Sequence, residues 1–259
     1  MNPMPELNPM LKQLRLSGIL DSLEIRTRQA IEEKLAYTDF LALLLQDETA
    51  RRSNKKLMQR LRKASVRGNK TIESYDFSFN PDIDKRQIMN LAACNFMQEK
   101  VSVLIVGPCG TGKSHIAQAI GHCAIRQEHD VLFTTQAKML SQLHAAQATN
   151  SYERKLKYFV KADLLIIDDF GLKPLQPPQD EYLHAVIGER YENRSTIITS
   201  NLDFNEWSEA FSNKLLGAAT IDRLRHGAYR IVLKGKSFRE PKPFPKTEKS
   251  SLAIGRKKS

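Results

Sequence analysis

Apolar residues in the first quarter of the chain recur at intervals of three and four. This spacing runs from residue 7 to residue 67, and Thr38 or Asp39 can cap a helix before the apolar run that follows. Such intervals put apolar side chains on one face of a helix, whereas strands alternate at every second residue. The sequence therefore predicts a small module of about three helices.

From Asn80-Pro81 onward the pattern changes to short apolar runs separated by helical stretches. A helix is expected over residues 84–98, and five runs have the character of strands: "VSVLIV", "DVLFTT", "ADLLIIDD", "STIITSN" and "YRIVLKG". Alternation of strands with helices is typical of a parallel sheet that helices cover on both faces. The predicted fold class is therefore α/β, preceded by a small all-helical N-terminal domain.

Three segments follow from these patterns. We expect a helical domain over residues 1–70, an α/β domain over residues 71–245 and a basic tail over residues 246–259. The sequence from Glu240 onward is rich in Pro, Lys and Ser, a composition typical of disorder.

The stretch "GPCGTGKS" matches the spacing G-x-x-x-x-G-K-[ST], and it lies between a predicted strand and a predicted helix. In such a loop, glycines let backbone N–H groups face phosphates, and the following helix presents its positive end. Lys113 would reach the β- and γ-phosphates, and Ser114 would hold Mg²⁺. The sequence thus predicts a site for ATP and Mg²⁺. Its nine residues are Gly107, Pro108, Cys109, Gly110, Thr111, Gly112, Lys113, Ser114 and His115.

Two acids end the strand-like run "ADLLIIDD", which follows the loop along the chain. Asp168 is expected to hold Mg²⁺ together with Ser114, and Asp169 to polarise the water that attacks the γ-phosphate. Asn201 ends the run "STIITSN" and could orient that water, because an uncharged amide does not repel phosphate. The alternative for Asn201 is a residue that only ends a strand.

Charge adds a second hypothesis, because the net charge of +11 is concentrated in two segments. Residues 51–70 contain nine Lys or Arg and no acid, and residues 223–259 contain twelve basic residues against two acidic ones. Basic segments bind polyanions by neutralising phosphates and releasing counterions, so nucleic acid is the leading partner. The proposed DNA contacts are Arg51, Arg52, Lys55, Lys56, Arg60, Arg62 and Lys63.

Two other interpretations of the first basic segment remain. A solvated helix face is the simpler one. An anionic membrane surface is disfavoured because the segment has a short apolar stripe and no aromatic anchor. No apolar run reaches the roughly 18 residues of a membrane span, the N-terminus lacks a signal-peptide core, and the three cysteines have no metal-ligand spacing. We therefore expect a cytoplasmic protein that does not enter a membrane.

Several motifs together resemble a known family. After "GPCGTGKSHIA" come "LLIIDDFG", "ERYENRSTIITSN", "FNEW", "IDRLRHGA" and "KGKSFR", and "DFLALLLQDETARR" precedes them. The chain resembles the IstB-type AAA+ ATPase subunit of insertion sequences, a transposition helper related to the DnaC helicase loader. This resemblance implies an initiator-type sheet, a helical insertion within residues 136–160, and an ATP-dependent homo-oligomer on duplex DNA.

Arginines matter because the transition state of phosphoryl transfer spreads negative charge beyond the reach of the loop lysine. The candidates are Arg190, Arg194, Arg223 and Arg239. The resemblance implies that Arg223 is a finger inserted into the neighbouring subunit's site, and that Arg239 is a sensor of its own nucleotide. For both residues the alternative is a surface ion pair, and for Arg223 the nearest acid in sequence is Asp222.

The sequence therefore predicts a DNA-binding ATPase that assembles with ATP on double-stranded DNA, remodels target DNA and recruits or activates a cognate transposase. The alternative is a DnaC-like helicase loader, in which the nucleotide acts as a switch during replication. A metabolic kinase is disfavoured, because "TSN" and "IDRL" have no role in phosphorylating a small acceptor.

Overall fold

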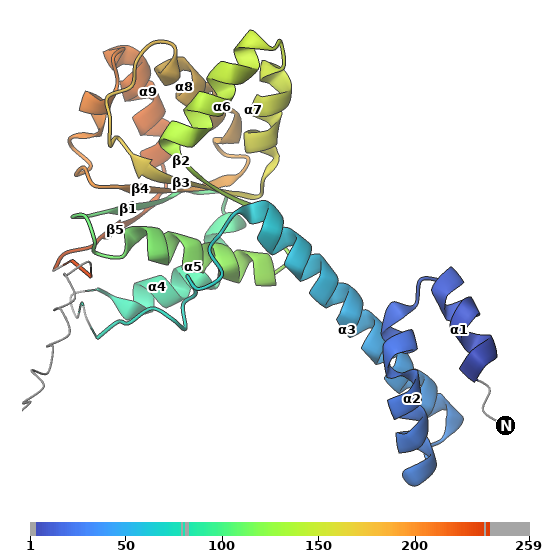
Figure 1. Cartoon of the computed structure of the whole chain (residues 1–259). Helices are drawn as coiled ribbons and strands as arrows, with labels where there is room; N and C mark the ends of the chain where they lie inside the picture. Colours follow the sequence, from blue (N-terminus) through green and yellow to red (C-terminus); the bar gives the residue numbers. More distant parts are fainter. Residues whose placement is uncertain (1–3, 79, 81–82, 236, 239–259) are drawn as a thin grey trace, which may run out of the picture.

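The computed structural model describes residues 4–78, 80, 83–235 and 237–238. The proposed sensor Arg239 and the predicted tail over residues 246–259 lie outside the described residues. Within the described part, a helical module projects from an α/β domain on one long helix (Figure 1).

Three helices form the N-terminal module, as the apolar spacing predicted. They are α1 (Met4–Gln13), α2 (Ser17–Glu32) and α3 (Tyr37–Ala64). Their common core is small: Ile19, Leu23 and Leu44 are buried, with Leu11, Leu16 and Phe40 packed around them. So small a core makes the polar contacts between α2 and α3 important for holding the module together.

A buried carboxylate joins α2 to α3. Leu16, the residue that caps α2, has no side-chain oxygen with which to accept N–H groups of the first turn. The Glu48 carboxylate of α3 takes this role, accepting the N–H of Gly18 at 2.6 Å and of Ile19 at 3.3 Å. A Cβ at Gly18 would meet the Glu48 Cα at 2.6 Å, so glycine is required for this close approach.

Helix α3 belongs to both parts of the molecule. Its last turns pack on the α/β domain, where Ala64 is fully buried and Leu57 and Leu61 are partly buried in the same cluster. Two ion pairs fasten this end, from Arg60 to Glu128 at 3.4 Å and from Lys63 to Asp130 at 3.2 Å. The helical module and the α/β domain therefore share one continuous helix.

The α/β domain is built on a five-stranded parallel sheet in the order β2-β3-β4-β1-β5. Alternate residues of each strand face opposite sides, and both sides are apolar: Leu104 and Val106 of β1 enter one core cluster, Val103 and Ile105 the other. The strands are β1 (Val103–Val106), β2 (Val131–Thr135), β3 (Leu164–Phe170), β4 (Ser195–Ser200) and β5 (Tyr229–Val232).

Helices cover both faces of this sheet (Figure 1). On one face lie α4 (Lys85–Ala92) and α5 (Lys113–Arg126), with the short 3-10 turn η1 (Asn95–Met97) after α4. The other face carries α6 (Gln136–Ala148), α7 (Tyr152–Lys161), α8 (Gln179–Arg190) and α9 (Lys214–Arg225), and the 3-10 turn η2 (Trp207–Ala210) precedes α9. The predicted α/β fold is confirmed.

The structure agrees with the sequence-based expectation between β2 and β3 and differs from it over residues 84–98. Helices α6 and α7 occupy the segment between β2 and β3, where an insertion over residues 136–160 was expected. The single helix expected over residues 84–98 is instead interrupted, because α4 ends at Ala92 and Cys94 adopts φ 63°. In the described residues, no helix is both long and apolar enough to span a bilayer.

Candidate nucleotide site

The glycine-rich loop connects the carboxyl end of β1 to the start of α5. Gly107, Gly110 and Gly112 all have positive φ, at 148°, 84° and 94°. A Cβ at Gly112 would also meet the Tyr75 ring at 2.9 Å. The loop thus has the backbone that only glycines adopt readily, and it ends at a helix N-terminus, which favours anions.

Lys113 and Ser114 are the first two residues of α5. The Lys113 side chain is buried against the loop, where its Nζ donates to the carbonyls of Gly107 and Pro108, both at 2.7 Å. The Ser114 hydroxyl donates to Asp168 Oδ1 at 2.8 Å. The structure therefore brings together the loop and the acidic strand, as expected from their place at the carboxyl ends of parallel strands.

The two acids differ in their surroundings. Both lie in β3, but Asp168 is 6% exposed, whereas Asp169 is exposed and its backbone has φ 57°. The Thr199 hydroxyl of β4 donates to Asp168 Oδ1, and Thr199 Oγ1 accepts the N–H of Asp169 at 3.2 Å. Thr199 is not among the residues predicted from the sequence, because its position opposite the acids depends on the register between two strands.

Asn201 lies at the same edge of the sheet. It follows Ser200, the last residue of β4, whose carbonyl accepts the Gly107 N–H at 3.3 Å. The Asn201 side chain is exposed. The backbone of Asn201 therefore directly follows the residue that bonds to the start of the phosphate loop.

The oxygens of Ser114 and Asp168 fit a Mg²⁺ ion. Mg²⁺ takes hard oxygen ligands, and it is commonly held by one or two protein groups together with phosphates and water. Within the part of the chain that the structure describes, no group of three or more His, Cys, Asp or Glu residues could form an all-protein metal cage. The hydroxyl of Ser114 and the carboxylate of Asp168 could therefore hold Mg²⁺ together with nucleotide phosphates.

His115 fastens the segment between α3 and α4 to the start of α5. Its Nε2 lies 3.0 Å from the Thr71 carbonyl and 3.2 Å from the Ser74 hydroxyl. Burial lowers the pKa of His115 below its usual value, which favours the neutral ring. Tyr75 of the same segment packs edge-on against His115, with ring centroids 5.1 Å apart, and its hydroxyl is 3.4 Å from the Thr111 carbonyl.

The three cysteines are free thiols. Cys109 is exposed within the phosphate loop, where the motif uses the backbone of this residue. Burial raises the pKa of the Cys94 thiol to about 12 and also raises that of Cys123. Both thiols are therefore held in the protonated form, which is the poorer nucleophile.

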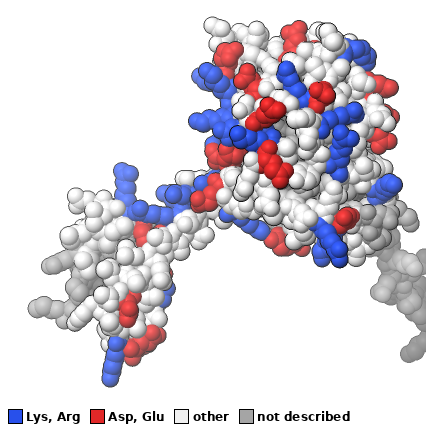
Figure 2. Space-filling view, turned by 180° about the vertical axis from the view of Figure 1, so that it is seen from behind, with Lys and Arg blue, Asp and Glu red and all other residues white. Residues whose placement is uncertain are grey.

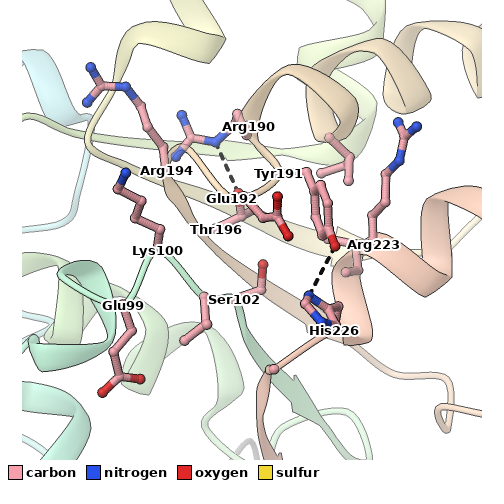
Figure 3. A pocket seen from close by; sticks show the side chains of 14 residues that line it. Glu99, Lys100, Ser102, Arg190, Tyr191, Glu192, Arg194, Thr196, Arg223 and His226 are labelled. Atoms are coloured by element: carbon pink, nitrogen blue, oxygen red, sulfur yellow. Dashed lines mark hydrogen bonds between the residues drawn. The ribbon is translucent and has the colours of Figure 1, made fainter.

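Arg223 lies at the opposite edge of the sheet from the phosphate loop. It lines a cavity of about 220 Å³ (Figure 3) with Ser102, Thr196 and Gly227, which lie at or just before the amino ends of β1, β4 and β5. A Cβ at Gly188 would meet Arg223 Nη1 at 2.7 Å, so the guanidinium lies against α8. Arg223 is therefore separated from its own loop by the length of the strands.

The other described arginine candidates have structural partners. Arg190 is 1% exposed, and its guanidinium donates to the carbonyls of Val160 at 2.8 Å and Ala162 at 2.7 Å. Arg194 pairs with Asp163. For Arg223, no carboxylate among the described residues lies within ion-pair distance, Asp222 included.

The seven basic residues proposed for DNA fall into two groups. Lys and Arg side chains are visible along the neck between the helical module and the α/β domain, with acids beside them (Figure 2). Lys55, Lys56 and Arg62 are exposed and form no ion pair with any described residue. Each of the other four contacts a carboxylate: Arg51 contacts Asp21, Arg52 contacts Glu48, Arg60 contacts Glu128 and Lys63 contacts Asp130.

Solved structures of replication proteins share the fold. A DnaA replication initiator bound to AMPPCP and single-stranded DNA superposes with a TM-score of 0.56 at 16% identity, over 66% of this chain and 52% of its own. The DnaC helicase loader superposes with a TM-score of 0.51 at 21% identity, over 61% of this chain and 98% of its own. The sheet order and the helices on both faces are therefore those of the AAA+ fold.

Sequence comparison gives the family. Residues 9–243 match the model of the IstB-like ATP binding protein. A protein assigned as the ATP-binding protein of insertion sequence IS21 in Pseudomonas aeruginosa is 34% identical over 91% of this chain and 89% of its own. A protein assigned as an insertion-sequence ATP-binding protein in Mycobacterium tuberculosis is 34% identical over 92% of this chain and 95% of its own. The chain belongs to the IstB-like ATP-binding proteins of insertion sequences.

Proposed function

We propose that this protein is an ATP-dependent regulator of transposition, which assembles with ATP on duplex DNA and hydrolyses the nucleotide between neighbouring subunits. The observation that carries the proposal is the position of Arg223. It lies at the amino ends of the strands, opposite the Ser114–Asp168 pair at their carboxyl ends. Subunits stacked head to tail would bring these two edges together, which a solitary chain cannot do.

Each residue of the loop edge has a separate task in hydrolysis. Lys113 and the loop N–H groups bind the β- and γ-phosphates, and Ser114 and Asp168 hold Mg²⁺, which neutralises phosphate charge. Asp169 accepts a proton from the attacking water. Asn201 donates from its amide to keep that water in line.

Arg223 of a neighbouring subunit completes the site. Its guanidinium stabilises the charge that develops on the transferred phosphoryl group, a contribution of roughly 10³–10⁵ in rate. The lack of a carboxylate partner for Arg223 among the described residues supports this task, since an ion pair would neutralise the charge that the transition state needs. Arg239, which lies outside the described residues, remains proposed as a sensor of the bound nucleotide.

DNA binding is proposed for the neck. Among the seven proposed contacts, Lys55, Lys56 and Arg62 are exposed and form no ion pair with any described residue, so they are available for phosphates. Relatives of this chain are assigned to insertion sequences, which supports a cognate transposase as the protein that the DNA-bound assembly recruits or activates in the cytoplasm.

Mixing two inactive variants tests hydrolysis in trans. Arg223→Ala subunits keep Lys113, and Lys113→Ala subunits keep Arg223. An interface that joins an intact loop to an intact Arg223 forms one complete site, so the mixture should recover ATPase activity that neither variant has alone. Co-assembled mixtures that stay inactive at every ratio would overturn the role of Arg223.

Imaging tests the DNA part of the proposal. Wild-type protein with a non-hydrolysable ATP analogue and long duplex DNA should form regular oligomers on the DNA. Failure to assemble on bare duplex, together with assembly on a replicative helicase, would instead identify a DnaC-like loader.

A further inference from the structure

We propose that Thr199 is the positioning residue that aims both acids of the nucleotide site. The inference rests on the proposed ATP hydrolysis, and it concerns how Asp168 and Asp169 obtain different orientations although they are adjacent. Thr199 lies one strand away, in β4, and is 1% exposed.

The strand register places Thr199 opposite both acids. In the parallel pairing of β3 with β4, Ile167 is level with Ile198, and the next aligned residues are Phe170 and Ser200. Two residues of β3, Asp168 and Asp169, therefore face the single residue Thr199. This extra residue forms a bulge, which re-aims side chains at the end of a strand.

The Thr199 hydroxyl is both a donor and an acceptor to the two residues of the bulge. Its proton goes to Asp168 Oδ1, the oxygen that also accepts the Ser114 hydroxyl at 2.8 Å. A lone pair on Thr199 Oγ1 accepts the Asp169 N–H at 3.2 Å. The first bond fixes the carboxylate that faces α5, and the second holds the backbone from which the Asp169 side chain projects.

The bond to Asp169 supports an unfavourable backbone conformation. Asp169 has φ 57°, in the left-handed region that non-glycine residues rarely occupy. Nearby polar side chains hold the residues that follow: Ser200 Oγ donates to the Phe170 carbonyl at 2.8 Å, and Gln136 Oε1 accepts the Gly171 N–H at 2.8 Å. Thr199 is the member of this group that touches the acids themselves.

Three variants test the assignment in the full-length protein. Thr199→Val keeps the shape of the side chain and removes the hydroxyl, Thr199→Ser keeps the hydroxyl, and Thr196→Val removes a buried hydroxyl at the other end of β4. We expect Thr199→Val to lower kcat for ATP about tenfold or more, since a misplaced general base loses part of its roughly 10²–10⁴-fold contribution. KM should change little, and Thr199→Ser should recover most of kcat.

A second measurement does not depend on hydrolysis. Because Thr199 orients the Asp168 carboxylate, Thr199→Val should raise the Mg²⁺ concentration needed for half-maximal binding of a fluorescent ATP analogue several-fold. Thr196→Val should lower the melting temperature without this shift. A wild-type protein that binds ATP with Mg²⁺ but does not hydrolyse it would refute the proposed ATPase and leave the magnesium result to decide the role of Thr199.

Two outcomes would overturn the inference. One is a Thr199→Val protein with wild-type kcat and wild-type Mg²⁺ dependence. The other is a Thr199→Ser protein as impaired as Thr199→Val, because the methyl group rather than the hydroxyl would then matter.

Discussion

Replacing Glu48 by Gln should weaken the helical module far more than replacing an exposed glutamate. Glu48 is 4% exposed, and its carboxylate accepts three hydrogen bonds, from Gly18 N, Ile19 N and Arg52 Nε. Gln retains the volume, but it loses the charge and turns an amide NH₂ toward groups that are themselves donors.

The magnitude follows from these bonds. Hydrogen bonds to a charged group are worth about 1.5–3 kcal/mol, and a negative charge at a helix N-terminus adds about 0.3–1 kcal/mol. The pair of helices is thin, so nearby solvent reduces both contributions. We therefore expect Glu48→Gln to lower the free energy of unfolding of the module by about 2 kcal/mol.

The effect should depend on pH. Burial, the largest influence, raises the pKa of Glu48, but the hydrogen bonds from Arg52, Gly18 and Ile19 outweigh it, so the pKa in the folded protein is lowered from 4.5. A carboxyl with a lowered folded pKa stabilises the protein above its unfolded pKa, and this contribution is lost as the pH falls through the folded pKa. The difference between wild type and Glu48→Gln should therefore be full at pH 7 and shrink below pH 4.5.

Hydrogen exchange of the α2 amides in the full-length protein measures this difference directly. The matched control is Glu24→Gln. It removes an exposed carboxylate of α2, which pairs with Arg28. Such exposed pairs contribute about 0–1 kcal/mol. Equal protection of α2 in both variants at pH 7, or a Glu48→Gln deficit that persists unchanged at low pH, would refute the capping role of Glu48.

Two further predictions concern the nucleotide site and the neck. Lys113→Ala should abolish stable ATP binding in a filter or fluorescence assay, whereas Asp169→Asn should bind ATP and accumulate the ATP-bound oligomer, because only proton acceptance is lost; equal loss of binding would contradict these roles. Replacing Lys55, Lys56 and Arg62 together by Gln should reduce the slope of log affinity against log salt by about 2.7 on duplex DNA of any sequence, at about 0.9 per phosphate contact. An unchanged slope would leave the neck as a solvated face.

The local parts of the site could be predicted from the sequence. The phosphate loop is encoded in eight consecutive residues, and its pairing with Asp168 follows because parallel strands present their carboxyl ends at one edge. Thr199 could not be found in this way, since only the shifted register of β3 and β4 places it opposite both acids.

The arginines show a second limit of sequence reasoning. Arg190 and Arg223 both occur in the last turn of a helix, and charge patterning does not separate them. Burial does: Arg190 is enclosed and satisfied by main-chain carbonyls, whereas Arg223 is only partly buried. The break at Cys94 was also not predicted, because apolar residues recur at helical spacing throughout residues 84–98 and give no sign of the helix end.

Because α3 is one uninterrupted helix, a rotation at its base would move the whole helical module. The 28 residues of α3 span about 42 Å at 1.5 Å per residue, and neither Gly nor Pro interrupts them to provide a joint. Its base is tied to the helix that starts at the phosphate loop, since the residues just after α3 bond to α5: Gln118 Oε1 accepts the Arg67 N–H at 2.9 Å, and His122 Nε2 lies 2.9 Å from the Arg67 carbonyl. A tilt of about 5° at this base would move the far end of α3 by about 3.7 Å, given the length that the helical rise implies. Leu44 and Glu48, on which α2 packs, lie about 30 and 24 Å from this base, so the same tilt would shift α2 by about 2–3 Å.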